Sequence, residues 1–325
     1  MAAADGGETA SEYAFELALC ARLERDDRVV ARQLGGGVAA PGRRVVDVVA
    51  VDPGPAFDDR AGITDETIPP TVVEGDVGVG RAVRADEAVD APPERRTAVL
   101  DRAVDAGFVE RTRRDGVVRY RQRTRYPDGW FAGLLAVENK PDLGRPGDME
   151  RQLRYDASLA LFDRVVLATE SHVTRAHLNR LPDPVGVWRF DPDTGERRVV
   201  REPSPLPADD PGVEPVERHP GRTAVRVVEP SAKRRVRRRV AERAYGKGWR
   251  PEPPACARCE PTADGRPHCA AFDRVVDPAR DCPDCPERAP SDPPAVDRAA
   301  LRDARSPWTA DPPGVAREQS GLTEF

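Results

Sequence analysis

A short apolar run that ends in two opposite charges constrains this chain more than any other feature. Residues 134–140 read Leu-Leu-Ala-Val-Glu-Asn-Lys, and Pro141 and Asp142 follow at once. Alternate side chains of a strand share a face, so Glu138 and Lys140 point the same way, and the proline then ends the strand. Such a pair can hold a hard cation and a water against a phosphate, or it can be a weak surface ion pair.

The apolar segments around this run predict a mixed α/β core. Buried-type strands are expected at four further places, namely 29–34, 43–51, 164–170 and 185–190. Helical spacing of apolar residues predicts helices at 13–25, 94–106 and 148–162, and a basic helix is expected at 231–245. The order of the core is therefore helix, strand, strand, insert, strand, helix, strand and strand.

Asp47 interrupts the otherwise apolar strand 43–51. A carboxylate inside such a run is costly unless it meets a cation, a hydrogen-bond donor or an exposed edge. Glu16 lies on the first helix, so the expected elements carry Glu16, Asp47 and then Glu138 with Lys140, in that order.

The insert ends in a helix followed by an arginine-rich hairpin. Asp115-Gly116 between two alternating runs is a strong turn signal and predicts a hairpin over 108–123. A helix followed by a basic hairpin resembles the second half of a winged helix, although it could also be an insert with a solvated basic face. The candidate nucleic-acid-binding residues of this hairpin are Arg111, Arg113, Arg114, Arg119, Arg121 and Arg123.

Positive charge is concentrated in two segments of an acidic chain. Residues 109–126 hold seven arginines against two acids, and 226–250 hold ten basic residues against two acids, yet the chain carries a net −5. Local basic patches on an acidic body favour a polyanionic partner. Arg235 and Arg238 in the second segment are therefore further candidate nucleic-acid-binding residues.

The order of Glu16, Asp47, Glu138 and Lys140 on their elements resembles the PD-(D/E)XK, or restriction-endonuclease-like, nuclease superfamily. Archaeal Holliday-junction resolvases and RecB-type nucleases of that superfamily also use a glutamate on the first helix. The resemblance covers about 1–55 and 130–200. It implies that Asp47, Glu138 and the Asn139 carbonyl bind Mg²⁺ or Mn²⁺, that Lys140 positions or deprotonates a water, and that Glu16 helps to hold a metal-bound water or a second ion.

Gln152 and Tyr155 on the following helix resemble the Gln-and-Tyr motif of RecB-type nucleases. The tyrosine falls three residues after the glutamine here, whereas it usually falls four after in those enzymes. The two residues are candidates for the catalytic site, and core packing is the alternative role for the tyrosine.

Four cysteines form two Cys-x2-Cys pairs, Cys256 with Cys259 and Cys282 with Cys285. Pairs at this spacing predict a tetrahedral structural Zn²⁺ site in a reducing compartment. Cys269 lies between the pairs, and a 4Fe–4S cluster is the alternative because some nucleases of the superfamily hold one through cysteines. Cys20 is expected to be a small buried residue.

We therefore expect a restriction-endonuclease-like mixed-sheet core in two parts, 1–55 and 129–202, with a winged-helix-like module at 56–128. A proline-rich linker and the basic helix occupy 203–250. The Cys-rich metal-binding element is expected at 251–290 and a disordered tail at 291–325. The chain has no long apolar run and no basic, apolar leader, which predicts a cytoplasmic protein without membrane contact.

The function predicted from the sequence is a divalent-metal-dependent nuclease that acts on DNA in repair, recombination or defence. The alternatives are a non-catalytic DNA-binding regulator on a degenerate nuclease fold and an RNA-processing factor. A homo-oligomer is compatible with either. Only three of the 51 basic residues are lysines, and this excess of arginine, with abundant acids, indicates a salt-adapted source.

Overall fold

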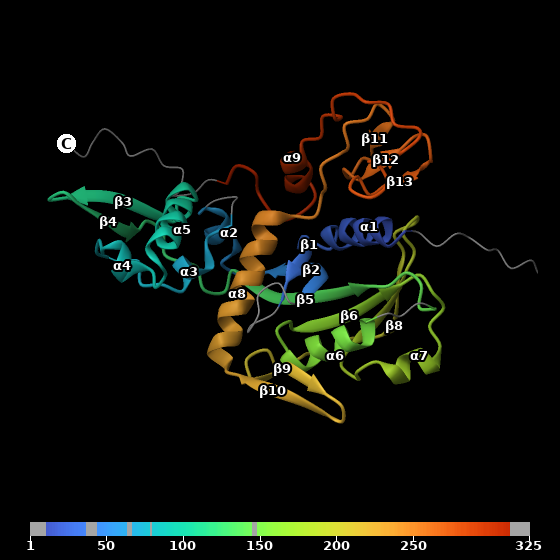
Figure 1. The fold of residues 1–325 in the computed structure, drawn as a ribbon, viewed down its shortest axis with the longest axis horizontal. Helices are drawn as coiled ribbons and strands as arrows, with labels where there is room; N and C mark the ends of the chain where they lie inside the picture. The colour runs from blue at the N-terminus through green and yellow to red at the C-terminus, as the bar shows by residue number, and fades with distance from the viewer. Residues whose placement is uncertain (1–10, 37–43, 64–66, 79, 145–147, 313–325) are drawn as a thin grey trace, which may run out of the picture.

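A six-stranded mixed sheet lies at the centre of the molecule (Figure 1). The computed structural model describes residues 11–36, 44–63, 67–78, 80–144 and 148–312. The sheet has the order β1 (Val29–Gly35), β2 (Val45–Pro53), β5 (Phe131–Asn139), β6 (Arg164–Thr169), β7 (Gly186–Phe190) and β8 (Arg197–Arg201). Strands β5, β6 and β7 are parallel and the other neighbours are antiparallel. The prediction of a mixed α/β core is confirmed, and β2 and β5 are neighbours as expected.

Helices cover both faces of this sheet. On one face lies α1 (Glu12–Glu24), whose apolar residues are buried against the strands. The Ser11 hydroxyl accepts a hydrogen bond from the backbone N–H of Ala14 at 3.2 Å and caps this helix. On the other face lie α6 (Met149–Leu159) and α8 (Pro230–Lys247), and α7 (Arg175–Arg180) follows β6.

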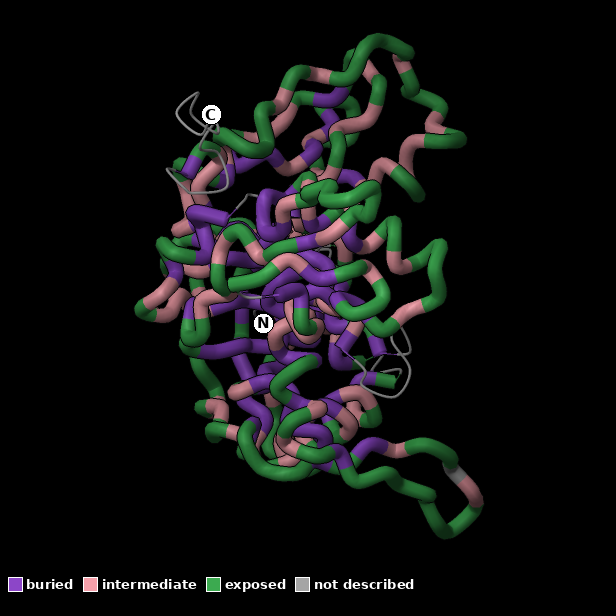
Figure 2. The backbone as a smooth tube through the Cα atoms, turned by 90° about the vertical axis from the view of Figure 1, so that its left-hand side faces the viewer, coloured by how far each residue is buried: buried purple, intermediate pink, exposed green. Residues whose placement is uncertain are grey.

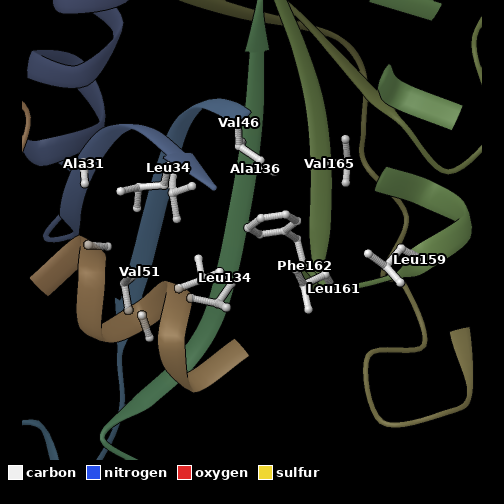
Figure 3. Close-up of a cluster of buried hydrophobic side chains, with 14 of the residues drawn as sticks. Ala31, Leu34, Val46, Val51, Leu134, Ala136, Leu159, Leu161, Phe162 and Val165 are labelled. Atoms are coloured by element: carbon white, nitrogen blue, oxygen red, sulfur yellow. The ribbon is translucent and has the colours of Figure 1, made fainter. Parts of the chain in front are cut away.

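The β-branched residues of β2 and the apolar run of β5 suit central strands that are buried on both faces. On the α6 and α8 side, Phe162 fills the space among Leu34, Val46 and Leu134 (Figure 3). This packing fixes the ends of β2 and β5, and therefore fixes the backbone positions of Asp47 and Glu138.

The segment between β2 and β5 has a hydrophobic core of its own, which includes Leu100, Phe108 and Tyr120. Its elements are α2 (Phe57–Ala61), α3 (Pro70–Val73), α4 (Ala85–Ala88), α5 (Pro93–Asp105), β3 (Val109–Arg114) and β4 (Val117–Gln122). Asp115 and Gly116 both have positive φ, at 53° and 76°, as a tight hairpin turn requires. The predicted helix and hairpin are both present.

Two segments have structure where the sequence indicated little. The proline-rich linker predicted from residue 203 contains a hairpin of β9 (Gly212–His219) and β10 (Arg222–Val228), which projects at the bottom of Figure 2 and is largely exposed. Pro215 is tolerated because this ribbon has two open edges. The disordered tail predicted for 291–325 is wrong for α9 (Arg298–Asp303) and for the buried Trp308, while 313–325 lie outside the described residues.

The Cys-rich element contains three short strands, β11 (Cys259–Pro261), β12 (Pro267–Cys269) and β13 (Arg274–Val275). It lies beyond α1 in Figure 1. A buried ion pair at 2.6 Å joins Arg250, just before this element, to Glu24 at the end of α1. Trp249 Nε1 also donates to Glu24, so the element is anchored firmly to the core.

Candidate functional site

Asp47 and Glu138 come together where β2 begins and β5 ends. Val48 pairs with Val137 in the antiparallel ladder. Asp47 and Glu138 are the next residues along the two strands, so they lie opposite each other. The backbone N–H of Asn139 donates to Asp47 Oδ2 at 2.9 Å, across 92 residues of sequence. The resulting site is built on rigid central strands, as a precise constellation requires.

A buried guanidinium lies beside this carboxylate pair. Arg44 donates to Glu138 Oε2 at 2.8 Å and makes a two-oxygen contact with Asp156 of α6, with its shortest distance 2.6 Å. All three side chains are less than one tenth exposed. Arg44 is therefore the local counter-ion of Glu138, and Asp156 holds the guanidinium in place.

The carboxylate of Glu16 is fully engaged by other side chains. Arg32 and the Gln33 amide donate to it, as does Asn139 Nδ2 at 2.8 Å. Gln33 has a φ of +54°, a left-handed conformation that is rare for this residue type. Its neighbours Arg32 and Leu34 pair with Val48 and Val46, on either side of Asp47. Glu16 thus orients Asn139, and the predicted contact of Glu16 with a metal-bound water stays a prediction.

Burial and mutual repulsion raise the pKa values of the two central carboxyl groups. Burial raises the pKa of Glu138 to about 8, with the neighbouring Asp47 adding to the rise and Arg44 opposing it. Burial likewise raises the pKa of Asp47 to about 6, against the Asn139 hydrogen bond and with help from Glu16 and Glu12. Both groups are close enough to repel each other, which is what a shared cation would relieve.

Lys140 lies at the edge of this site. Its backbone N–H donates to the carbonyl oxygen of Ala168 on β6, and its Nζ lies 3.4 Å from Glu12 Oε1. The Lys140 side chain is about one quarter exposed, so it can reach both Glu12 and a molecule bound from solvent. Glu12 lies one turn before Glu16 on α1.

Gln152 and Tyr155 lie about one turn apart on α6. Gln152 is one turn before Asp156 on α6 and shares its face, which is directed toward Arg44. The Tyr155 hydroxyl instead donates to Glu214 of β9 at 2.8 Å. Tyr155 thereby ties the projecting hairpin to the core, in agreement with the packing role, and its predicted catalytic part is untested.

The basic residues fall into two groups with different surroundings. In the hairpin, Arg111, Arg113, Arg114 and Arg121 are exposed, although Arg111 pairs with Asp101 and Arg121 with Glu110.

On α8, by contrast, Arg235 lies 4.0 Å from Glu74 and Arg238 lies 3.2 Å from Asp128. The helix packs on β1, and its Glu242 forms a buried ion pair with Arg60 of α2. Much of its positive charge is therefore neutralised within the fold.

Five of the six cysteines line one cavity of about 340 Å³. Cys259 and Cys269 are cross-strand neighbours on β11 and β12, and both are buried. Cys20 lies apart, fully buried in the core beneath α1, as expected for a small apolar residue. The two predicted Cys-x2-Cys pairs thus meet, together with Cys269, at a single place.

Three residues of the carboxylate site were not anticipated from the sequence, namely Arg44, Asp156 and Glu12. Arg44 lies three residues before Asp47 and Asp156 directly follows Tyr155, but neither position has a chemical pattern of its own. Glu12 shares a helix face with Glu16, and that spacing was the one available signal.

Within the described part of the chain, no three His, Cys, Asp or Glu side chains form a group that could hold a metal ion. Mg²⁺ commonly takes only one or two carboxylates and completes its shell with waters and phosphate oxygens. Asp47 and Glu138 meet that smaller requirement. The buried Asn139 Oδ1, which has no hydrogen-bond partner among the described residues, is a further hard oxygen at the site.

Fold and site together define a mixed α/β protein with a carboxylate pair, an arginine and a lysine at the end of its central strands. A family model described as a family of unknown function (DUF5787) matches residues 29–290, and the chain belongs to this family. The searches of curated proteins and of solved structures gave no significant match. No helix in the described ranges is long and apolar enough to cross a membrane.

Proposed function

We propose that this protein is a divalent-metal-dependent nuclease of the PD-(D/E)XK type that hydrolyses phosphodiester bonds in DNA. One observation carries the proposal: the fold brings Asp47 to Glu138 and Lys140 across an insert of 77 residues between β2 and β5, and fixes Asp47 through the Asn139 backbone. A metal ion bound here would stabilise charge on the phosphate and lower the pKa of a bound water.

The residues have distinct parts in this proposal. Asp47 and Glu138 would hold the ion, and Asn139 contributes an oxygen that Glu16 keeps in place. Lys140 would orient the attacking water, and the compact ammonium suits this role better than a planar guanidinium. The raised pKa values of the two carboxyl groups agree with a site in which a bound cation would offset the cost of their negative charges.

The inserted module supports a nucleic-acid partner. In chain order it has short helices, an isolated strand pairing of Val83 with Tyr120, the helices α4 and α5, and then the hairpin. Because Val83 pairs with the second strand of the hairpin, the module has the element order of a winged helix, with the arginine-rich hairpin as the wing. Such a wing would contact phosphates without reading sequence.

A polar groove offers a path for a strand beside the site. It is lined by Ser11 and Ala14 at the start of α1, by Arg189 and Arg198 of β7 and β8, and by Phe272 of the Cys-rich element. Arg266 and Arg274 add positive charge, and five carboxylates also line it, namely Glu170, Asp191, Asp193, Glu196 and Asp273. Phe272 is exposed and could stack on a base. Glu170, also in this groove, donates its backbone N–H to Pro141, the neighbour of Lys140.

A non-catalytic DNA-binding regulator is the second candidate, and Arg44 favours it. A guanidinium that already neutralises Glu138 lowers the affinity of that carboxylate for a metal ion. Incubation of the protein with labelled single-stranded, duplex and branched DNA, with Mg²⁺, Mn²⁺ or EDTA, separates the two. Metal-dependent cleavage supports the nuclease, and binding without cleavage of any substrate supports the regulator.

A further inference from the structure

We propose that the protein cuts duplex DNA at a distance from the arginine-rich β3–β4 hairpin, so that the cleaved phosphate lies about six base pairs or more from the phosphates that this hairpin contacts. The inference rests on the proposed function and names the substrate of that same site, a straight duplex long enough to reach both parts of the molecule. Three observations carry it: where the insert joins the sheet, which buried contacts fix the insert, and which face of the hairpin carries arginines.

The insert joins the central sheet at the end of β2 and β5 that is opposite to the carboxylate site. Pro53, the last residue of β2, pairs with Phe131, the first of β5, so the chain leaves the sheet and re-enters it at one point. Asp47 lies six residues before Pro53, and Glu138 lies seven residues after Phe131. At about 3.3 Å per residue of strand, the site is about 20 Å from this junction.

The hairpin lies farther from the site than this junction does. In Figure 1, α8 stands between the insert and the sheet, and the β3–β4 hairpin projects from the insert away from the sheet. The head of the β5 arrow, where Glu138 lies, points to the other side of the molecule. The junction distance of about 20 Å is therefore a lower limit, and at about 3.4 Å per base pair it corresponds to about six base pairs.

Buried contacts fix the insert to α8, so the hairpin is held at this distance. Arg60 of α2 is fully buried and donates to both carboxylate oxygens of Glu242 on α8, with a shortest distance of 2.7 Å. The hydroxyl of Tyr126, which follows the hairpin, donates to Glu242 Oε1 at 3.1 Å and accepts the indole N–H of Trp130 at 2.6 Å. Thr67 Oγ1 donates to the Glu242 carbonyl oxygen at 3.0 Å. Since α8 itself packs on β1, β2 and β5, these contacts join the insert firmly to the sheet.

The hairpin presents an arginine-bearing face to solvent. Alternation along the β3–β4 ladder places Arg114, Arg119 and Arg121 on one face. The buried Val109 and Tyr120 lie on the other face, toward the core of the insert. Cations on the outer face can contact phosphates of any sequence. A duplex, whose persistence length is about 150 base pairs, is straight over the distance from these cations to the site.

Cleavage of stem-loop duplexes of increasing length tests the inference. Stems of about 6, 12, 18 and 24 base pairs, closed by the same loop, are cut in Mg²⁺ under single-turnover conditions with subsaturating protein. Wild type is compared with Arg114→Ala/Arg119→Ala and with the control Arg222→Ala/Arg226→Ala, which removes the same charge from the other exposed hairpin, β9–β10. Because longer stems also offer more cleavable bonds, the readout is the ratio of the wild-type rate to the variant rate at each length.

For Arg114→Ala/Arg119→Ala we expect a ratio near one on the shortest stem and a ratio of about five or more on the two longest stems, because only the long stems reach the hairpin. The control should give a ratio near one at every length. Circular dichroism of each variant verifies that the fold is retained.

An equal ratio at every length overturns the inference. A constant ratio of one means that the hairpin does not contact the substrate, and a constant higher ratio means that it contacts phosphates beside the cut. A ratio that grows equally in the control also overturns it, since general loss of charge would then explain the effect. Each of these outcomes leaves the nuclease proposal standing, whereas absence of cleavage of every stem by wild type contradicts both.

Discussion

Arg44 donates to Glu138 Oε2 at 2.8 Å, and both side chains are less than one tenth exposed. The positive charge of Arg44 therefore lies next to Glu138, the proposed metal ligand. In a nuclease of the proposed type, Arg44 would oppose the rise that burial causes in the pKa of Glu138 before the ion arrives, and would then compete with that ion. This relationship makes the energetics of the site testable apart from catalysis.

The first prediction concerns a double-mutant cycle on Arg44 and Asp156. Arg44→Gln should lower the free energy of unfolding by about 3–5 kcal/mol, since it leaves Asp156 buried without its partner. The double variant Arg44→Gln/Asp156→Asn should recover part of this loss, because neither charge remains buried. Urea unfolding of these two variants and of Asp156→Asn completes the cycle, and additive losses would contradict the pairing.

The same double variant should bind Mn²⁺ several-fold more tightly than the wild type in the absence of DNA. The reason is that Asp47 and Glu138 remain in this variant, whereas Arg44, which competes with a metal ion for Glu138, is absent. Calorimetry measures the affinity, and Arg28→Gln, which removes a half-buried partner of Asp52, is the matched control. Equal affinity in the double variant and the wild type would show that the guanidinium does not compete.

Stability should depend on pH through Asp47 when no metal is present. Its pKa is raised to about 6 by burial, above the usual value of about 3.9, so the folded state holds a proton that the unfolded state has released. The associated stability is complete below about pH 4 and is lost as the pH rises through 6. The difference in unfolding free energy between wild type and Asp47→Asn should fall over that window.

Mg²⁺ should reduce this loss, because an ion that binds only the folded state stabilises it at higher pH. Urea titrations in EDTA and in Mg²⁺, from pH 4 to 8, provide the comparison. In EDTA, the unfolding free energy of wild type relative to Asp47→Asn should not rise with pH. A rise would mean that the folded state favours the ionised Asp47, contrary to our account.

The salt dependence of DNA binding should depend more on the arginines of the β3–β4 hairpin than on those of α8. Replacing Arg113, Arg119 and Arg123 by Ala should lower the slope of log K against log salt by about 0.9 for each phosphate of duplex DNA that is no longer neutralised. Arg235→Ala/Arg238→Ala should change it less, since those side chains lie beside Glu74 and Asp128. Fluorescence anisotropy at several salt concentrations gives the slopes, and the reverse ranking would place the DNA on α8.

The buried pair between Arg60 and Glu242 joins the insert to α8, and it should dominate the stability of that junction. The two side chains are essentially unexposed, and Arg60 also lies over the Tyr245 ring at 4.1 Å. Glu242→Gln should cost about 3 kcal/mol or more. Asp128→Ala, which breaks an exposed pair with Arg238, should cost less than about 1 kcal/mol. Equal costs in thermal or urea unfolding would be inconsistent with this difference in burial.

Much of the fold was predictable because its signals are local. The apolar strands, the Asp115-Gly116 turn and the helices were found from periodicity and turn residues. The hairpin of β9 and β10 was missed because its prolines and charges are typical of linkers, and what holds it is the distant contact of Glu214 with Tyr155.

The site was predictable only in part, because some of its contacts join residues that lie far apart in the chain. Asp47, Glu138 and Lys140 form a short pattern in chain order, but the partnership of Arg44 with Asp156 spans 112 residues and exists only in the fold. The partners of the α8 arginines were likewise not predictable, since Glu74 and Asp128 lie more than 100 residues away in the chain.

Single-turnover cleavage by wild type and Lys140→Ala, with the surface variant Arg298→Ala as control, tests the central claim most directly. Truncation of Lys140 at the end of a strand opens no core cavity, so folding and DNA affinity should stay near wild type. The account predicts Mg²⁺-dependent cleavage by wild type and Arg298→Ala and none by Lys140→Ala or Lys140→Arg. Wild-type rates in Lys140→Ala would contradict it.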